Sequence, residues 1–241
     1  MGARRCLVNT PALAPGRVEG SAILTERFES FQGEGPWTGQ RCVFVRFSRC
    51  NLRCGFCDTP ESWDWSRYNP AEVSDRVPIA ELVSWVRERG VDMMVITGGE
   101  PMLQRTAMTA LARGLANVRV QVETNGTIAP TPELASLVDL WVVSPKLANS
   151  GMTYSARIKP EALSALAATD RAVFKFVVVE PDRDLDEIAQ LVEEHQLAPV
   201  WVMPEGTTQE KVLAGMDALY GPATDRGWNV STRLHILTGA R

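Results

Sequence analysis

The sequence predicts an α/β fold in which parallel strands form a barrel or part of a barrel, with helices on the outside. Short apolar runs alternate with helical patterns along the 241 residues, and this alternation is typical of right-handed units built on a parallel sheet. Several polar motifs directly follow the apolar runs, and barrels place their sites at these carboxyl ends of strands. Together with the chain length, these observations favour a barrel or part-barrel over a doubly wound sheet.

Each element follows from its local pattern. Apolar runs of about four to eight residues between turn-forming residues predict strands, and longer stretches with one apolar face predict helices. We expect strands at 22–29, 42–47, 93–97, 118–123, 140–143, 173–179, 200–203 and 229–232. We expect helices at 79–89, 102–116, 132–137, 160–168, 185–195 and 209–220. The longest irregular stretch is 58–77, where Trp63, Trp65 and Tyr68 suggest a lid over a site.

Composition predicts one domain at 21–241, preceded by an irregular tail at 1–20 that contains prolines and glycines without periodicity. An apolar content of 45% is sufficient for a large core. The formal net charge of −4 gives no basic surface for nucleic acid, so we expect a small-molecule substrate. No apolar run approaches the ~20 residues that span a bilayer, and the chain starts without a signal-peptide core. We therefore expect no membrane partner and a cytoplasmic location, where thiols stay reduced.

Three cysteines lie within eight residues in the pattern C-x-x-x-C-x-x-C, at Cys50, Cys54 and Cys57. Three thiolates can hold three irons of a 4Fe-4S cluster and leave the fourth iron free to bind a small molecule. A structural zinc site would need a closed shell of four ligands, which this loop does not supply. The alternative is a chance group of half-buried cysteines. Cys6 and Cys42 lie apart from the loop and are interpreted as ordinary free thiols.

This loop resembles the cluster loop of the radical S-adenosylmethionine (SAM) enzymes, in which the open iron binds the amino and carboxylate groups of SAM. The resemblance implies the incomplete, TIM-like barrel of that family, and it places Phe56 near the adenine, although Phe56 can also be a packing residue. The segment from Thr97 to Pro101 resembles the GGEP motif of the same enzymes. There Gly99 and Glu100 would contact the amino group of SAM; the alternative is a tight turn and helix cap.

Later strand ends extend the resemblance to SAM binding. The segments Glu123-Thr124-Asn125-Gly126-Thr127 and Ser144-Pro145-Lys146 resemble those that hold the ribose and carboxylate. Met203-Pro204-Glu205-Gly206 resembles a segment near the adenine. The resemblance thus assigns SAM contacts to Glu123, Asn125, Ser144, Pro145, Lys146, Met203, Pro204, Glu205 and Gly206. Each segment could instead be a simple turn, with Lys146 a surface lysine.

Strand alternation independently places Arg46 on the side of the cysteine loop. Side chains of a strand point alternately to opposite faces, so Val43, Val45 and Phe47 share one face while Arg46 lies on the other. The same alternation separates Val120 and its apolar neighbours from Arg119, Gln121 and Glu123. Charged side chains inside a barrel are costly unless they pair or meet a polar ligand. The alternative for Arg46 and for Glu123 is a structural ion pair.

The segment Ser30-Phe31-Gln32-Gly33-Glu34-Gly35 and the ending Cys57-Asp58-Thr59 resemble 7-carboxy-7-deazaguanine synthase over nearly the whole chain, from about Glu26 to Leu237. The family implies conversion of 6-carboxy-5,6,7,8-tetrahydropterin to 7-carboxy-7-deazaguanine with loss of ammonia, in queuosine and deazapurine biosynthesis. It implies no catalytic side chain beyond the radical that the cofactor supplies. It assigns the pterin to Phe31, Gln32, Gly33, Glu34, Arg46, Thr97 and His235. It assigns Mg²⁺ to the hydroxyl of Thr59, which the residues alone would make a cap or turn.

Two other function classes share the cysteine pattern. A radical-activating enzyme that acts on a partner protein also has C-x-x-x-C-x-x-C, but it would lack the QGEG segment and the Cys-Asp-Thr ending. An iron-sulfur electron carrier would not need motifs at successive strand ends. The family further implies a homodimer and an electron donor such as flavodoxin or ferredoxin. The sequence itself identifies neither the reductant, the fate of the product, nor the residue that binds the adenine.

Overall fold

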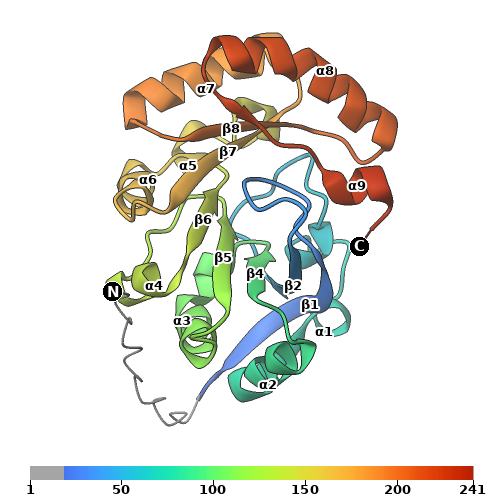
Figure 1. Ribbon diagram of the computed structural model, residues 1–241, viewed down its shortest axis with the longest axis vertical. Coiled ribbons are helices and arrows are strands. Elements are labelled where there is room, and N and C mark those ends of the chain that lie inside the picture. The colour runs from blue at the N-terminus through green and yellow to red at the C-terminus, as the bar shows by residue number, and fades with distance from the viewer. Residues whose placement is uncertain (1–18, 241) are drawn as a thin grey trace, which may run out of the picture.

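The structure is a computed structural model that describes residues 19–240. Cys6 and nearly all of the expected tail at 1–20 lie outside the described residues. The remaining chain folds into a curved sheet with helices on its convex side (Figure 1).

The sheet contains the strands β1 (Ser21–Phe31), β2 (Arg41–Phe47), β3 (Asp75–Pro78), β4 (Met93–Gly98), β5 (Arg119–Thr124), β6 (Leu140–Val143), β7 (Ala172–Val178), β8 (Val200–Pro204) and β9 (Asn229–Val230). Their order is β3-β1-β2-β4-β5-β6-β7-β8-β9. Every neighbouring pair from β2 to β9 is parallel, whereas β1 is antiparallel to both β2 and β3. The order ends at two strands that do not pair, so the sheet is open and the expected partial barrel is confirmed.

The helices are α1 (Pro70–Val73), α2 (Ile79–Arg89), α3 (Arg105–Gly114), α4 (Pro132–Leu137), α5 (Tyr154–Arg157), α6 (Pro160–Ala167), α7 (Pro181–His195), α8 (Gln209–Asp225) and α9 (Leu234–Thr238), with 3₁₀ turns η1 (Pro60–Ser62), η2 (Pro101–Gln104) and η3 (Ala148–Ser150). The six predicted helices are present, but α7 begins at Pro181 instead of 185, α8 ends at Asp225 instead of 220, and the sequence did not predict α1, α5 or α9. A further difference is at 102–116. The chain there first forms η2, because Pro101 lacks an N–H and Glu100 caps the turn by accepting from the backbone N–H of Met102. Helix α3 follows it.

The sequence predicted an irregular stretch at 58–77, and this prediction is wrong. The stretch contains η1, α1 and the edge strand β3, which pairs with β1. Trp65 in this stretch is 42% exposed, whereas Trp63 lines the central cavity. The sequence missed β3 because its residues Asp75-Arg76-Val77-Pro78 carry no apolar run.

The main core lies between the convex face of the sheet and the helices. On β2, the alternating residues Val43, Val45 and Phe47 are fully buried in this core, as predicted. The concave face is apolar only toward the amino-terminal half of the parallel strands, where Trp37 of the β1–β2 connection packs against Phe44 and Leu140 and their neighbours. The connection thus fills the lower part of the concave side and leaves its carboxyl-terminal part for a cavity. None of the helices in residues 19–240 is both long and apolar enough to cross a membrane.

Candidate active site

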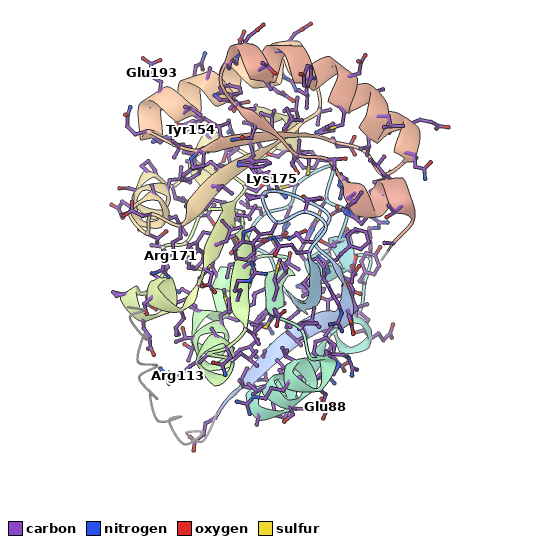
Figure 2. All side chains as sticks on the ribbon, in the orientation of Figure 1. Glu88, Arg113, Tyr154, Arg171, Lys175 and Glu193 are labelled. Carbon is purple, nitrogen blue, oxygen red and sulfur yellow. The ribbon has the colours of Figure 1, made fainter. Side chains whose placement is uncertain are left out.

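A cavity of about 470 Å³ opens at the carboxyl ends of the parallel strands. Residues from β1, β2, β4, β5, β6, β7 and β8 line it, together with the cysteine loop and α9. Segments far apart in sequence therefore contribute to one site. Figure 2 shows Lys175 on the inner side of the sheet, whereas Arg113 and Glu193 lie on the outer helices.

The cysteine loop connects β2 to η1, and Cys50, Cys54 and Cys57 all line the cavity. Two sulfurs accept hydrogen bonds, that of Cys50 from the Leu52 backbone N–H at 3.4 Å and that of Cys57 from Trp63 Nε1 at 3.2 Å. Burial raises the pKa of the Cys50 thiol to about 12. Iron binding deprotonates a thiol outright, so such a thiol becomes a thiolate only with its metal. Cys42 is buried in an apolar cluster and does not line this cavity.

The GGEP turn packs directly against the start of the cysteine loop. A side chain at Gly98 would lie 2.1 Å from the Phe47 carbonyl oxygen, and one at Gly99 would lie 2.3 Å from the Arg49 carbonyl oxygen. Glycine is therefore required at both positions because a side chain would clash with the neighbouring backbone, whether or not a ligand is bound. The fully buried Glu100 carboxylate accepts hydrogen bonds from Met102 N, Thr124 Oγ1 and Asn125 N. Its side chain thus holds the GGEP and Glu-Thr-Asn-Gly turns together and does not line the cavity.

Lys146 lies in the cavity beside the cysteines. Its Nζ donates to Ser144 Oγ at 2.9 Å, and among the described residues no carboxylate forms an ion pair with it. The buried Arg157 fixes the loop by donating to the Lys146 carbonyl at 2.7 Å and pairing with Glu187. The amino group is therefore held in place with its charge available to an anionic ligand.

Glu123 lies in a different part of the cavity from Lys146. Its carboxylate accepts hydrogen bonds from Gln32 Nε2 at 3.1 Å, Thr97 Oγ1 at 2.8 Å and Gln121 Nε2 at 3.3 Å. The resemblance assigned Glu123 to SAM, but two of its partners belong to the group assigned to the pterin. The structure thus brings Gln32, Thr97 and Glu123 together.

A buried ionic network surrounds Glu34. Its carboxylate contacts Lys175 Nζ and accepts from Arg233 Nε at 3.0 Å, and Arg233 also binds Asp58 and the Gly206 carbonyl. Despite the opposing effect of burial, the two cations lower the pKa of Glu34 to about 2. The network ties the Gln-Gly-Glu-Gly turn to β7, α9 and the cysteine loop.

Sequence reasoning missed Lys175 and Arg233. The alternation on β7 could have indicated Lys175, because Phe174, Phe176 and Val178 are buried in the main core and Lys175 and Val177 line the cavity. No comparable signal identifies Arg233, which precedes the short helix α9.

His235 on α9 completes this side of the cavity. Its ring lies against Gly33, where an added Cβ would approach Nδ1 to 2.2 Å. Burial lowers the pKa of His235, so the ring is neutral at neutral pH. Thr59 also lines the cavity; it occupies the cap position of η1, but its hydroxyl makes no capping hydrogen bond and lies 3.8 Å from Cys57 Sγ.

Most of the expected site residues meet in this cavity. The lining residues from the expected set are Phe31, Gln32, Gly33, Glu34, Arg46, Cys50, Cys54, Phe56, Cys57, Thr59, Thr97, Gly99, Glu123, Asn125, Ser144, Lys146, Met203, Glu205 and His235. Four expected SAM residues do not line it, namely Glu100, Pro145, Pro204 and Gly206.

Comparison with known proteins agrees with this geometry. Residues 44–143 match the model of the Radical SAM superfamily. The chain is 37% identical to 7-carboxy-7-deazaguanine synthase from Pyrobaculum aerophilum, covering 89% of this chain and 93% of that protein. It is 38% identical to the synthase from Hyperthermus butylicus, covering 89% and 91% of the two chains. The chain belongs to the 7-carboxy-7-deazaguanine synthase family.

The fold of this synthase family member also resembles a solved structure. The crystal structure of QueE from Escherichia coli superposes with a TM-score of 0.67 at 24% identity, covering 89% of this chain and 95% of the other. The match of residues 44–143 to the Radical SAM superfamily model implies a 4Fe-4S cluster and SAM as cofactors. The cavity fits such a cluster, because it is lined by three cysteines and two N–H groups donate to their sulfurs.

Proposed function

We propose that this protein converts 6-carboxy-5,6,7,8-tetrahydropterin to 7-carboxy-7-deazaguanine with loss of ammonia, in queuosine or deazapurine biosynthesis. The single observation that carries the proposal is the shared cavity. The same cavity is lined by the three cysteines and Lys146 and also by Arg46, Thr97 and residues of the Gln-Gly-Glu-Gly turn. A cofactor site and a site for a small anionic substrate are thus contiguous. The curated relatives carry the synthase name, and no observation favours a protein-activating enzyme or an electron carrier.

In this proposal Cys50, Cys54 and Cys57 would hold the cluster, and Lys146 would belong to the SAM site. The cluster and SAM, when bound, would supply the radical chemistry that removes a hydrogen from the pterin. The chain's own residues orient the groups. Lys146 Nζ is available for the SAM carboxylate, and Gly99 and Asn125 line the same cavity.

The pterin occupies the other side of the cavity. Arg46 binds its carboxylate, for which a planar guanidinium is well suited. Glu123 is held by three donors as a hydrogen-bond acceptor, and Glu34 remains ionised next to Lys175 and Arg233. Both carboxylates are thus placed to accept from N–H groups of the pterin ring. Phe31 and His235 add flat surfaces at the rim.

We also propose that Thr59 contributes a ligand to Mg²⁺. Magnesium keeps several waters and is often bound by only one or two protein groups. The hydroxyl of Thr59 is not used to cap η1 and lines the cavity. Thr59→Ala should weaken the Mg²⁺ dependence of turnover and leave reductive SAM cleavage intact, with Thr38→Ala as the control; an unchanged magnesium response would remove Thr59 from the site.

The cluster assignment is tested by iron analysis after anaerobic reconstitution. We expect about four irons per chain in the wild-type protein and loss of the cluster when all three loop cysteines become alanine. Cys42→Ala should retain the cluster, since Cys42 lies in an apolar cluster outside the cavity. Loss of iron in Cys42→Ala, or its retention in the triple variant, would contradict the assignment.

The proposal further includes a cytoplasmic homodimer reduced by flavodoxin or ferredoxin. Light scattering of the purified protein tests the dimer, and SAM cleavage with each reduced donor tests the electron source. A monomer, or cleavage with dithionite only, would contradict the respective part.

A further inference from the structure

Trp63 lines the cavity, and its only polar side-chain atom faces a cysteine sulfur. Its Nε1 donates to Cys57 Sγ at 3.2 Å. An indole N–H is a donor only, so it favours the sulfur in its most negatively charged form. The tryptophan therefore contributes a hydrogen bond to the site in addition to apolar packing.

The position of the indole is fixed by the turn that carries it. Trp63 N donates to the Pro60 carbonyl, and Ser62, fully buried, donates through Oγ to the Thr59 carbonyl at 2.7 Å. The Ser62 carbonyl in turn accepts from the backbone N–H of Arg49 at 2.7 Å, directly before Cys50. The turn is therefore attached to both ends of the cysteine loop, and Trp63 follows it directly.

The three sulfurs have different surroundings. Cys50 Sγ accepts from the backbone N–H of Leu52. Burial raises the pKa of Cys54, and the charge of Lys146 opposes it. Cys57 is the one loop cysteine of the described chain whose sulfur has a side-chain N–H donor. A change at Trp63 therefore alters one sulfur and leaves the backbone of the loop unchanged.

We propose that Trp63 raises the reduction potential of the cluster through its hydrogen bond to Cys57. This inference rests on the proposed ligation of the cluster by Cys50, Cys54 and Cys57. Each one-electron reduction adds a negative charge to the cluster and its thiolates, so an N–H donor to a ligand sulfur stabilises the reduced form more than the oxidised form. Hydrogen bonds to the sulfurs are among the factors that set cluster potentials. Trp63 is thus a positioning residue that changes the reduction potential of the cluster through Cys57.

The test is an EPR-monitored redox titration of the reconstituted protein. Trp63→Phe keeps an aromatic ring and removes the N–H donor, and we expect the equilibrium constant for one-electron reduction to fall about tenfold, a shift of about 59 mV to more negative potential. Trp65→Phe is the matched control, because Trp65 is 42% exposed and is not among the residues that line the cavity; the potential of this variant should equal that of the wild type. A fully loaded Trp63→Phe protein with the wild-type potential would overturn the inference.

A measurement on the wild-type protein does not depend on the variant folding. With tryptophan labelled by ¹⁵N in the indole ring, pulsed EPR of the reduced cluster should show hyperfine coupling to an indole nitrogen, and Trp63→Phe should lose it. A cluster-loaded wild-type protein without this coupling would overturn the inference. Absence of any cluster from the wild-type protein would instead contradict the proposed ligation, so the two failures are distinguishable.

Discussion

Arg46 and Glu26 lie directly opposite each other on the antiparallel strands β2 and β1, and Arg46 Nε donates to Glu26 Oε1 at 2.8 Å. Both residues line the cavity. The bond uses the Nε side of the guanidinium, and within residues 19–240 no hydrogen bond involves its two terminal nitrogens. An arginine held in this way can still bind a second carboxylate with its terminal nitrogens. The ion pair therefore orients Arg46 and is compatible with substrate binding.

The first prediction concerns this pair. Arg46→Ala should raise the KM for the carboxy-pterin by about thirtyfold, which corresponds to ~2 kcal/mol for the loss of a partly buried charge contact. Arg46→Lys should restore part of the affinity, because an ammonium lacks the planar fork. Steady-state kinetics at saturating SAM measure the effect.

Glu26→Gln separates the two roles of Arg46. If Arg46 binds substrate, Glu26→Gln should raise the KM by a few-fold at most, since the terminal nitrogens remain. Equal losses of thermal stability in Arg46→Ala and Glu26→Gln, with normal pterin KM in both, would make Arg46 a structural ion-pair partner only.

The second prediction concerns Lys146. Lys146→Met should weaken SAM binding by about tenfold, because a charged hydrogen bond contributes ~1.5 kcal/mol or more, while the iron content stays at the wild-type level. Isothermal titration of SAM into the reconstituted protein measures the affinity. Lys159→Met, a change of an exposed lysine on another loop, is the control, and equal affinities in the two variants would remove Lys146 from the SAM site.

The third prediction compares two glycines at the cluster loop. Gly99→Ala should prevent cluster loading, because the new Cβ would lie 2.3 Å from the Arg49 carbonyl oxygen and 2.9 Å from Cys50 Cβ. Gly55→Ala lies inside the cysteine motif itself but should load normally, since its Cβ would have only an ordinary contact at 3.9 Å. The iron content of the two variants after identical reconstitution measures their cluster loading. Equal loading would contradict the packing argument.

The fourth prediction concerns the pH dependence of stability. Glu34 has a pKa lowered from 4.5 to about 2, so its ion pairs stabilise the fold above about pH 4.5, and this contribution is lost as the pH falls toward 2. Glu34→Gln should therefore reduce the free energy of unfolding at pH 7 by about 3 kcal/mol, as for breaking a buried pair. The deficit should shrink below about pH 4.5.

Urea unfolding of the wild type and the variant at several pH values measures this difference. Glu81→Gln is the control, because Glu81 pairs with Arg27 at the surface with 51% of its side chain exposed, and such pairs contribute at most about 1 kcal/mol. A deficit for Glu34→Gln that does not change with pH would contradict the role of its charge.

The sequence predicted the strands and the positions of most site residues for a physical reason. Strand periodicity is local, so alternation on β2 was sufficient to place Arg46 opposite Val45 and its core neighbours. The motifs at strand ends converged because parallel strands end at the same edge of a sheet. The residues at the strand ends could thus be predicted to share a site without knowing how the sheet curves.

The partners of those residues could not be predicted in the same way. Lys175 meets Glu34 across 141 positions of sequence, and Arg233 meets it across 199. Such contacts depend on how far the open sheet curves and where α9 returns, and no local pattern specifies either. For the same reason no local pattern indicates that the hydrogen bonds of Glu123 join it to Gln32 and Thr97.

The most direct test of the central claim is product formation by the reconstituted protein. Under anaerobic conditions with reductant, Mg²⁺, SAM and 6-carboxy-5,6,7,8-tetrahydropterin, mass spectrometry should detect 7-carboxy-7-deazaguanine and released ammonia in equal amounts. Because the family implies catalytic use of SAM, the product should exceed the SAM consumed. A protein that carries its cluster and cleaves SAM but leaves the pterin unchanged would contradict the proposed function.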